Sequence, residues 1–178
     1  NAIYQGTSAI MLSGETAAGA YPVEALKTMA RIAERTEQDI DYRKRFLQNK
    51  LPILGSITNA ISKATVNAAM ELDAKAIVTV TESGRTAYMI SGYRPVCPVI
   101  ACTSKEQTYR QLSLSWGIIP LLIEEKEALD ELFEEAIKAV EKASYASEGD
   151  VIVLTAGVPI GTSGTTNLLK VHCIESQD

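Results

Sequence analysis

Residues 76–102 read AIVTVTESGRTAYMISGYRPVCPVIAC and contain two short, continuous apolar runs, at 76–80 and 98–102. Continuous apolar runs of this length are typical of strands that are buried on both faces of a sheet. Residues 85–93, which lie between the two runs, have the pattern of a short helix. A strand, a helix and a second strand in this order predict a crossover unit, in which the two strands lie parallel in one sheet.

The same alternation extends in both directions along the chain. Before the first run we expect a helix that Ser56 or Thr58 caps and that ends near Leu72. Its predicted apolar face includes Ile57, Ile61, Ala64, Val66 and Ala68. After the second run, the pattern predicts helices over 106–115 and 128–145 and strands over 118–123 and 151–154.

A last strand is expected over 168–174, but only about a dozen residues, rich in Gly and Thr, separate it from the strand before. Because so short a connection cannot hold a helical crossover, we expect this strand to pair antiparallel at an edge of the sheet. The sequence therefore predicts an α/β fold of three layers, αβα, with a mostly parallel five-stranded sheet and an antiparallel edge strand.

The beginning of the chain has a different pattern. Residues 9–12 form a short apolar run that Ser13, Gly14 and Glu15 interrupt, which is typical of a strand that feeds a loop. Pro22 suits the first turn of a helix that reaches about Glu37. Since this strand has no predicted partner, we interpret the first part of the chain as a fragment of a larger sheet. The expected organisation is a fragment over 1–38, a linker over 39–55 and a domain over 56–178.

The composition excludes several classes of protein. With 178 residues, 46% hydrophobic and 22% charged, the chain is typical of a folded globular protein. No apolar run approaches the roughly 20 residues that cross a bilayer, and no signal-peptide pattern is present, so we expect a cytoplasmic protein without membrane contact. Three cysteines, Cys97, Cys102 and Cys173, form neither a ligand cluster nor an even set of disulfides, and we interpret them as buried thiols in a reducing compartment.

A net charge of −5 disfavours an anionic ligand in general, but here the excess negative charge is confined to one stretch. Residues 124–142 hold eight acidic and three basic side chains, which is the whole excess. We interpret this stretch as the solvated face of a helix, and we expect no binding of nucleic acid.

Two loops have the residues of a phosphate site. Residues 81–86 join a buried strand to the start of a helix, where hydroxyls, a glycine and Arg85 could bind an anion; the alternative is an ordinary turn with Ser83 as N-cap. Residues 156–167 hold three glycines and four hydroxyls; the alternative here is plain turn chemistry. If their strands are neighbours, the two loops would face each other and could clasp one phosphorylated ligand.

Other candidates are weaker. Glu15 could be a polar active-site group or could favour the positive end of the helix that begins at Pro22. His172, the only histidine, is expected to be structural, and Trp116 is expected to pack, with ligand stacking as the alternative. No Walker loop, metal-binding cysteine set or nucleophile elbow is present.

Several motifs resemble pyruvate kinases, and together they cover essentially the whole chain. GTSAIMLSGETAAG at 6–19, followed by YPVEA at 21–25, resembles the last strand and loop of that family's (β/α)₈ barrel. TESGRTA at 81–87, YRP at 93–95, RQL at 110–112 and the loop at 157–167 resemble successive landmarks of its C-terminal domain. The resemblance is to the bacterial type, and it departs from the family at Ser8, where an acid is usual.

The resemblance implies a glycolytic enzyme that transfers phosphate from phosphoenolpyruvate to ADP, giving pyruvate and ATP, with Mg²⁺ and K⁺, as a homotetramer. It places only Ser13 and Glu15 near the mouth of the active site, so we expect this chain alone to be inactive. It also implies an allosteric site for an effector phosphate, formed by Thr81, Glu82, Ser83, Gly84, Arg85, Thr86, Gly161, Thr162, Ser163, Gly164 and Thr165.

The resemblance also indicates which kind of effector to expect. Family members regulated by fructose 1,6-bisphosphate hold its second phosphate with a tryptophan and an arginine, and residues 124–135 contain neither. AMP or a sugar monophosphate is therefore expected rather than the bisphosphate. Two alternatives remain open at this point: a free-standing phosphate-binding regulatory module without an enzyme, and an assembly domain whose loops bind nothing.

Overall fold

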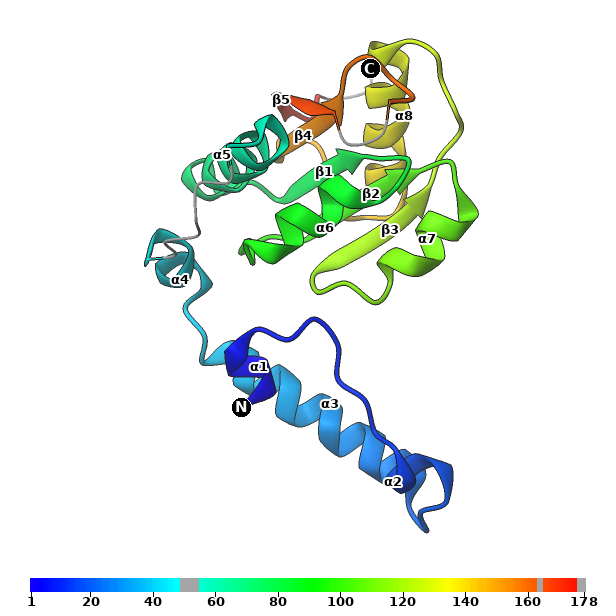
Figure 1. Ribbon diagram of the computed structural model, residues 1–178. Helices are drawn as coiled ribbons and strands as arrows, with labels where there is room; N and C mark the ends of the chain where they lie inside the picture. Colours follow the sequence, from blue (N-terminus) through cyan, green and yellow to red (C-terminus); the bar gives the residue numbers. More distant parts are fainter. Residues whose placement is uncertain (49–54, 163–164, 176–178) are drawn as a thin grey trace.

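The computed structural model describes residues 1–48, 55–162 and 165–175 (Figure 1). A five-stranded sheet forms its centre, in the order β3-β2-β1-β4-β5. The strands are β1 (Ala76–Val80), β2 (Val99–Thr103), β3 (Ile118–Leu122), β4 (Val151–Gly157) and β5 (Thr166–Cys173). The strands β1 to β4 are parallel to one another and β5 is antiparallel to β4, as the sequence predicts.

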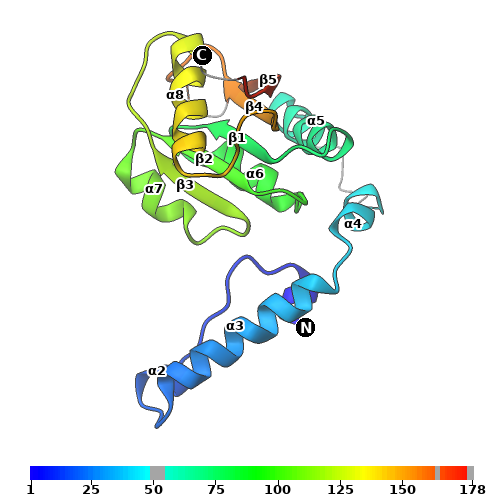
Figure 2. The same ribbon diagram turned by 180° about the vertical axis from the view of Figure 1, so that it is seen from behind.

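Four helices cover the sheet: α5 (Ile57–Glu71), α6 (Arg85–Gly92), α7 (Glu106–Leu112) and α8 (Leu129–Lys142). Figures 1 and 2 show α5, α6 and α7 on one face and α8 on the other. Alternate strand residues supply the two cores. Ile77 packs with Val66 and Ile90 on the first face, whereas Val78 packs with Phe133 on the second. The three-layer αβα architecture is therefore confirmed.

The buried face of α5 differs from the predicted one. Ile57 is 71% exposed, whereas Ser62 and Thr65 are fully buried. The hydroxyl of Ser62 donates to the carbonyl of Thr58 at 2.7 Å, and that of Thr65 donates to the carbonyl of Ile61 at 2.8 Å. Because each hydroxyl is satisfied within its own helix, burial carries little cost, and the polar side of α5 can face the sheet. The predicted face is correct at Val66, which is fully buried, and wrong at Ile57 and Ala64, which are exposed, because the prediction counted apolar positions only.

The first part of the chain is mostly helical: α1 (Ala2–Gln5), α2 (Gly14–Ala17), α3 (Pro22–Gln38) and α4 (Tyr42–Gln48). The helix that begins at Pro22 is confirmed. Residues 9–12, where the sequence predicts a strand, form no ladder with any described strand, and a strand needs a partner to satisfy its hydrogen bonds, so this strand stays a prediction. The stretch predicted as a linker contains α4, whose Phe46 is 5% exposed and meets Tyr93 at a ring distance of 5.9 Å.

The apolar side chains of α3 remain in contact with solvent. Val23, Leu26 and Ile32 are each more than half exposed, and no residue of α3 is buried. Met11, in the preceding segment, is 86% exposed. An amphipathic helix normally buries its apolar stripe against another element. Within the described part of the chain, α3 has no such partner for that stripe.

Candidate functional site

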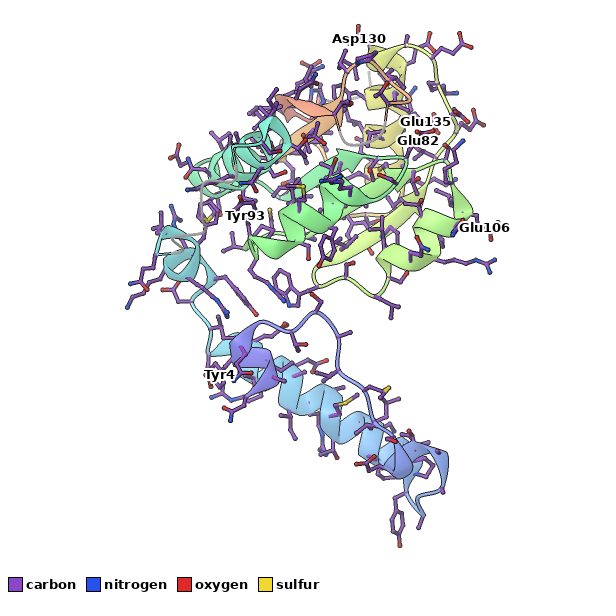
Figure 3. The ribbon with its side chains drawn as sticks, in the orientation of Figure 1. Tyr4, Glu82, Tyr93, Glu106, Asp130 and Glu135 are labelled. Carbon is purple, nitrogen blue, oxygen red and sulfur yellow. The ribbon has the colours of Figure 1, made fainter. Side chains whose placement is uncertain are left out.

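The candidate site lies where the parallel strands end. The carboxyl ends of β1, β2, β3 and β4 meet at one edge of the sheet, and a cavity there is lined by residues that follow each of them. Glu82, labelled in Figure 3, lies at this edge. Ligands of open α/β sheets bind in such a crevice. The two loops that the sequence singles out follow β1 and β4, which are neighbours, and both line the cavity.

The turn after β1 has a fixed conformation. The backbone N–H of Gly84 donates to the Thr81 hydroxyl at 3.0 Å, and the Thr108 hydroxyl of α7 donates to the Glu82 carbonyl at 2.7 Å. Gly84 has φ +75°, and a Cβ there would come within 2.9 Å of Leu112 Cδ2. Only glycine fits both the conformation and the space. The turn therefore delivers the N-terminus of α6, with its unpaired N–H groups and partial positive charge, to the cavity.

The loop after β4 is tied at its base and to the first loop. Asn167 bridges it, since Oδ1 accepts from the Val158 N–H at 3.0 Å and Nδ2 donates to the Val158 carbonyl at 2.7 Å. The hydroxyls of Thr86 and Thr166 share a hydrogen bond, which joins α6 to the start of β5. The Thr165 hydroxyl donates to the Thr162 carbonyl at 2.7 Å. The expectation that the two loops face each other is confirmed.

Charged side chains surround the mouth of the cavity. Lys126 Nζ lies 2.7 Å from a carboxylate oxygen of Glu124. That hydrogen bond and charge lower the pKa of Glu124, and the same contact raises the pKa of Lys126. Lys105 Nζ lies 3.2 Å from Glu125 and 3.9 Å from Glu82. Lys105 thus links the loops after β1 and β3, and Lys126 brings a cation to the cavity lining.

Most of the predicted effector-phosphate residues lie together. The cavity lining includes Thr81, Glu82, Ser83, Thr86, Gly161, Thr162 and Thr165. Gly84 and Arg85 do not line it; they line a separate surface groove between α6 and α7. Ser163 and Gly164 lie outside the described residues.

Several polar lining residues were not predicted from the sequence, among them Thr103, Ser104 and Lys126. Thr103 and Ser104 follow β2, so the same strand-end rule that selected the other loops would have found them. Lys126 lies within the acidic stretch 124–142, which we interpreted as a solvated face because of its net negative charge. The net charge of a stretch does not show where one of its lysines lies.

Ser13 and Glu15 are not part of this cavity. Both are exposed, and the carboxylate of Glu15 accepts the Ser13 N–H at 2.9 Å. Hydrogen bonds from backbone N–H groups, its own and that of Ser13, lower the pKa of Glu15. Glu15 therefore stabilises the first turn of its own short helix, α2, by the charge effect expected at a helix N-terminus.

The thiols and the histidine take no part in the cavity lining. Burial raises the pKa of Cys97 to about 11 and that of Cys102 to about 12. The expectation of three buried thiols is confirmed for Cys102 only: Cys97 is half-buried, and Cys173 is exposed because it lies on the solvent side of the edge strand β5. His172 pairs with Ile152 in the β4–β5 ladder.

The described residues contain neither a cluster of metal ligands nor a helix that could span a membrane. No group of three or more His, Cys, Asp or Glu side chains there is placed to hold a metal ion. No helix in the same residues is long and apolar enough to cross a bilayer.

Comparisons with known proteins agree with one another. The family model described as "Pyruvate kinase, alpha/beta domain" matches residues 59–172. Pyruvate kinases of Sporosarcina psychrophila and Geobacillus stearothermophilus are 51% and 47% identical over 174 residues, which is 98% of this chain and 30% of each relative. The pyruvate kinase of Clostridium acetobutylicum is 45% identical over 175 residues, 98% of this chain and 37% of the relative. The chain thus spans about a third of the length of the relatives it matches.

Proposed function

The chain belongs to the pyruvate kinase family, and we propose that it is the C-terminal, regulatory part of an enzyme that transfers phosphate from phosphoenolpyruvate to ADP in glycolysis. In this proposal the cavity binds the phosphate group of a small effector. The observation that carries it is the convergence of α6's N-terminus, four strand ends and two linked hydroxyl-rich loops on one cavity. Backbone N–H groups at a helix N-terminus with adjacent hydroxyls are a common anion site.

Lys126 supplies the cation for this phosphate. Lys126 lines the cavity, and its ammonium lies 2.7 Å from a carboxylate oxygen of Glu124, which lines the cavity as well. A phosphate dianion competes with the Glu124 carboxylate for the ammonium, and charge-assisted hydrogen bonds to phosphate are among the stronger ones. Arg85, which the sequence favours for this role, lines the groove outside the cavity.

The effector carries one phosphate. Carboxylates of Glu82, Glu124 and Glu125 line the cavity and would repel a second phosphate. Ile123 and Ile160 line it as well and offer an apolar surface for a sugar or a base. AMP and sugar monophosphates therefore fit better than fructose 1,6-bisphosphate.

Catalysis by the whole enzyme would use Mg²⁺ and K⁺ to neutralise the phosphates. The described residues of this chain do not fit such an ion, since they hold no group of three or more metal-ligating side chains. Ser13 and Glu15, the residues proposed near the mouth of the active site, are too few to bind the metal and orient the substrate. We expect no turnover of phosphoenolpyruvate by this chain alone.

We further propose that residues 1–38 are the last strand and helix of a (β/α)₈ barrel, 39–55 the linker and 56–178 the effector domain. The exposed apolar side chains of α3 support this, because a barrel would bury them. The whole enzyme is proposed to be a cytoplasmic homotetramer. A free-standing regulatory module would leave the same side chains in water, and we consider it the weaker alternative.

Calorimetric titration of the purified chain tests the effector site. We expect ribose 5-phosphate or AMP to bind and fructose 1,6-bisphosphate to bind more weakly. Lys126→Gln should weaken binding at least about tenfold, in line with the loss of a charged hydrogen bond. Lys138→Gln, a matched change at an exposed lysine of α8, should have no effect. If none of the three ligands gives a heat of binding, the effector site is refuted. The alternative of an assembly domain whose loops bind nothing would then remain.

A further inference from the structure

A surface groove lies between α6 and α7, beside the candidate site. Its lining includes Arg85, which the sequence favours for the effector phosphate and which the structure places outside the cavity. Arg85 and Tyr88 are three residues apart on α6, so both side chains lie on the same side of that helix. Gln111 of α7 and Ser115, in the segment that follows it, line the groove as well. Polar side chains from both helices therefore form the rim of the groove.

The floor of the groove is apolar and closely packed. Leu112 lies in the lining and is 5% exposed. A Cβ at Gly84 would come within 2.9 Å of Leu112 Cδ2 and 3.3 Å of Thr108 Cγ2, so the backbone of the turn packs directly on α7. The Thr108 hydroxyl is already bonded to the carbonyl oxygen of Glu82. The floor therefore offers a ligand an apolar surface rather than hydrogen bonds.

The polar groups of the rim are not used by the described part of the chain. Arg85, Tyr88 and Gln111 are exposed, and their side chains form no hydrogen bond or ion pair with a described residue. Arg110, close by on α7, is different because its guanidinium pairs with Glu106. A guanidinium presents its N–H groups as a planar fork that matches a carboxylate. The rim thus holds donors that are available to a ligand.

The charge of the groove is positive. Among the described residues, no Asp or Glu side chain lines it. The carboxylate of Glu82 lies on the other side of the turn, where it lines the cavity and faces Lys105 Nζ at 3.9 Å. An anion in the groove would therefore meet the unpaired guanidinium of Arg85, whereas an ammonium group would find no carboxylate to accept its hydrogen bonds.

We propose that this groove binds a small 2-oxo acid with an apolar side chain. The carboxylate of the acid accepts hydrogen bonds from the fork of Arg85, and the adjacent keto oxygen accepts another from the rim, at Tyr88 or Gln111. The apolar part of the acid packs on Leu112. The corresponding amino acid fits less well, because an ammonium replaces the keto acceptor next to a guanidinium. This site is separate from the effector cavity and does not depend on it.

Nuclear magnetic resonance of the nitrogen-labelled, full 178-residue chain tests the site. The probe is 4-methyl-2-oxopentanoate, and leucine is its matched control, since the two share the carbon skeleton and the carboxylate. We expect saturable shifts of the Gln111 side-chain amide and of the backbone N–H groups of Arg85 and Tyr88, with a Kd of about 1 mM. Leucine should bind at least about tenfold more weakly.

Variants of the rim identify the groups that bind the acid. Arg85→Gln should weaken binding at least about tenfold, and Arg85→Lys should restore only part of it, because an ammonium does not form the fork. Tyr88→Phe keeps the ring and removes the hydroxyl, so it should weaken binding about threefold. Arg110→Gln, at an exposed arginine outside the lining, is the matched control and should have no effect. All these side chains are exposed, and the spectra report whether each variant is folded.

Two of the variants separate the groove from the cavity. Arg85→Gln should leave the affinity for ribose 5-phosphate within about twofold of the wild type, because Arg85 does not line the cavity. Lys126→Gln should leave the affinity for the 2-oxo acid unchanged, because Lys126 does not line the groove. Failure of ribose 5-phosphate to bind would refute the effector site alone.

Several results would overturn the proposal. Equal affinity for the 2-oxo acid and for leucine, or undiminished binding to Arg85→Gln, would show that the rim does not recognise the acid. Shifts confined to Thr81 and Thr162 would assign the acid to the cavity instead. Shifts that do not saturate would mean that Arg85 is only a surface charge that attracts anions. Inorganic phosphate is the last probe, and tighter binding of phosphate at the same resonances would contradict a carboxylate site.

Discussion

The hydroxyl of Thr86 shares a hydrogen bond with the hydroxyl of Thr166, across 80 positions of sequence. Thr86 stands in the first turn of α6 and Thr166 is the first residue of β5. Both side chains are buried, with 6% and 2% exposure. The bond therefore joins the two loops that form the candidate phosphate site at a largely buried position.

Replacement of either hydroxyl should destabilise the fold. Thr86→Val leaves the Thr166 hydroxyl buried without this partner, which costs about 1–3 kcal/mol of the free energy of unfolding. The double variant Thr86→Val/Thr166→Val removes both polar groups, so it should cost less than the sum of the two single variants. Urea denaturation of the four proteins measures the difference. Strict additivity would show that the two hydroxyls do not interact.

Gly84 is expected to be the glycine least tolerant of substitution. Gly84→Ala combines left-handed backbone strain of about 1–2 kcal/mol with a clash against Leu112, which adds about 1–3 kcal/mol. Gly117→Ala is a matched control, because Gly117 has φ +64° with nothing within 4 Å of the added Cβ. Gly117→Ala should therefore show the strain alone. Equal losses of unfolding free energy in the two variants would contradict the close packing of the turn on α7.

The order of helices and strands in the sheet domain could be predicted from sequence. Continuous apolar runs, such as residues 76–80, indicate buried strands, and they alternate with segments that have the pattern of a helix. The buried side of α5 could not, since Ser62 and Thr65 hide their hydroxyls within the helix, which apolar periodicity does not detect. A strand over 9–12 could not be judged locally either, because a strand exists only with a partner.

In the candidate site, too, some residues could be predicted from the sequence and others could not. Strand-end loops identified Thr81 and Thr162, because topology brings such loops together. The side-chain direction of a long residue is not encoded in its position in a motif. Arg85 therefore lies in an outer groove, and Lys126, from an acidic stretch, lies in the cavity lining.

Removal of the carboxylate that competes for Lys126 should strengthen phosphate binding. Glu124→Gln keeps the shape of the side chain and frees the ammonium, so we expect the affinity for ribose 5-phosphate to rise several-fold. Arg85→Ala should change it less than about twofold, because Arg85 does not line the cavity. Calorimetry at low and high salt measures both. A large loss in Arg85→Ala would mean that its side chain reaches the ligand.

Alkaline pH should destabilise the protein through its buried thiols. Burial raises the pKa of Cys97 to about 11 and that of Cys102 to about 12, from 9.0. A group with a raised pKa in the folded state stabilises fully below its unfolded pKa and loses that contribution as pH rises toward the folded value. The unfolding free energy should therefore fall from about pH 9 to about pH 11, by up to about 1.4 kcal/mol per pH unit for each thiol.

The cysteine variants isolate this effect from other groups that titrate in the same range. Cys102→Ala lowers stability at neutral pH, because it leaves a small cavity, but it should flatten the fall between pH 9 and pH 11. Cys173→Ala, at an exposed cysteine, serves as the matched control and should leave the slope unchanged. Urea denaturation at intervals across this range gives the slopes. Identical slopes in the wild type and in Cys102→Ala would assign the pH dependence to other groups, such as Tyr42 and Tyr93, whose pKa burial also raises.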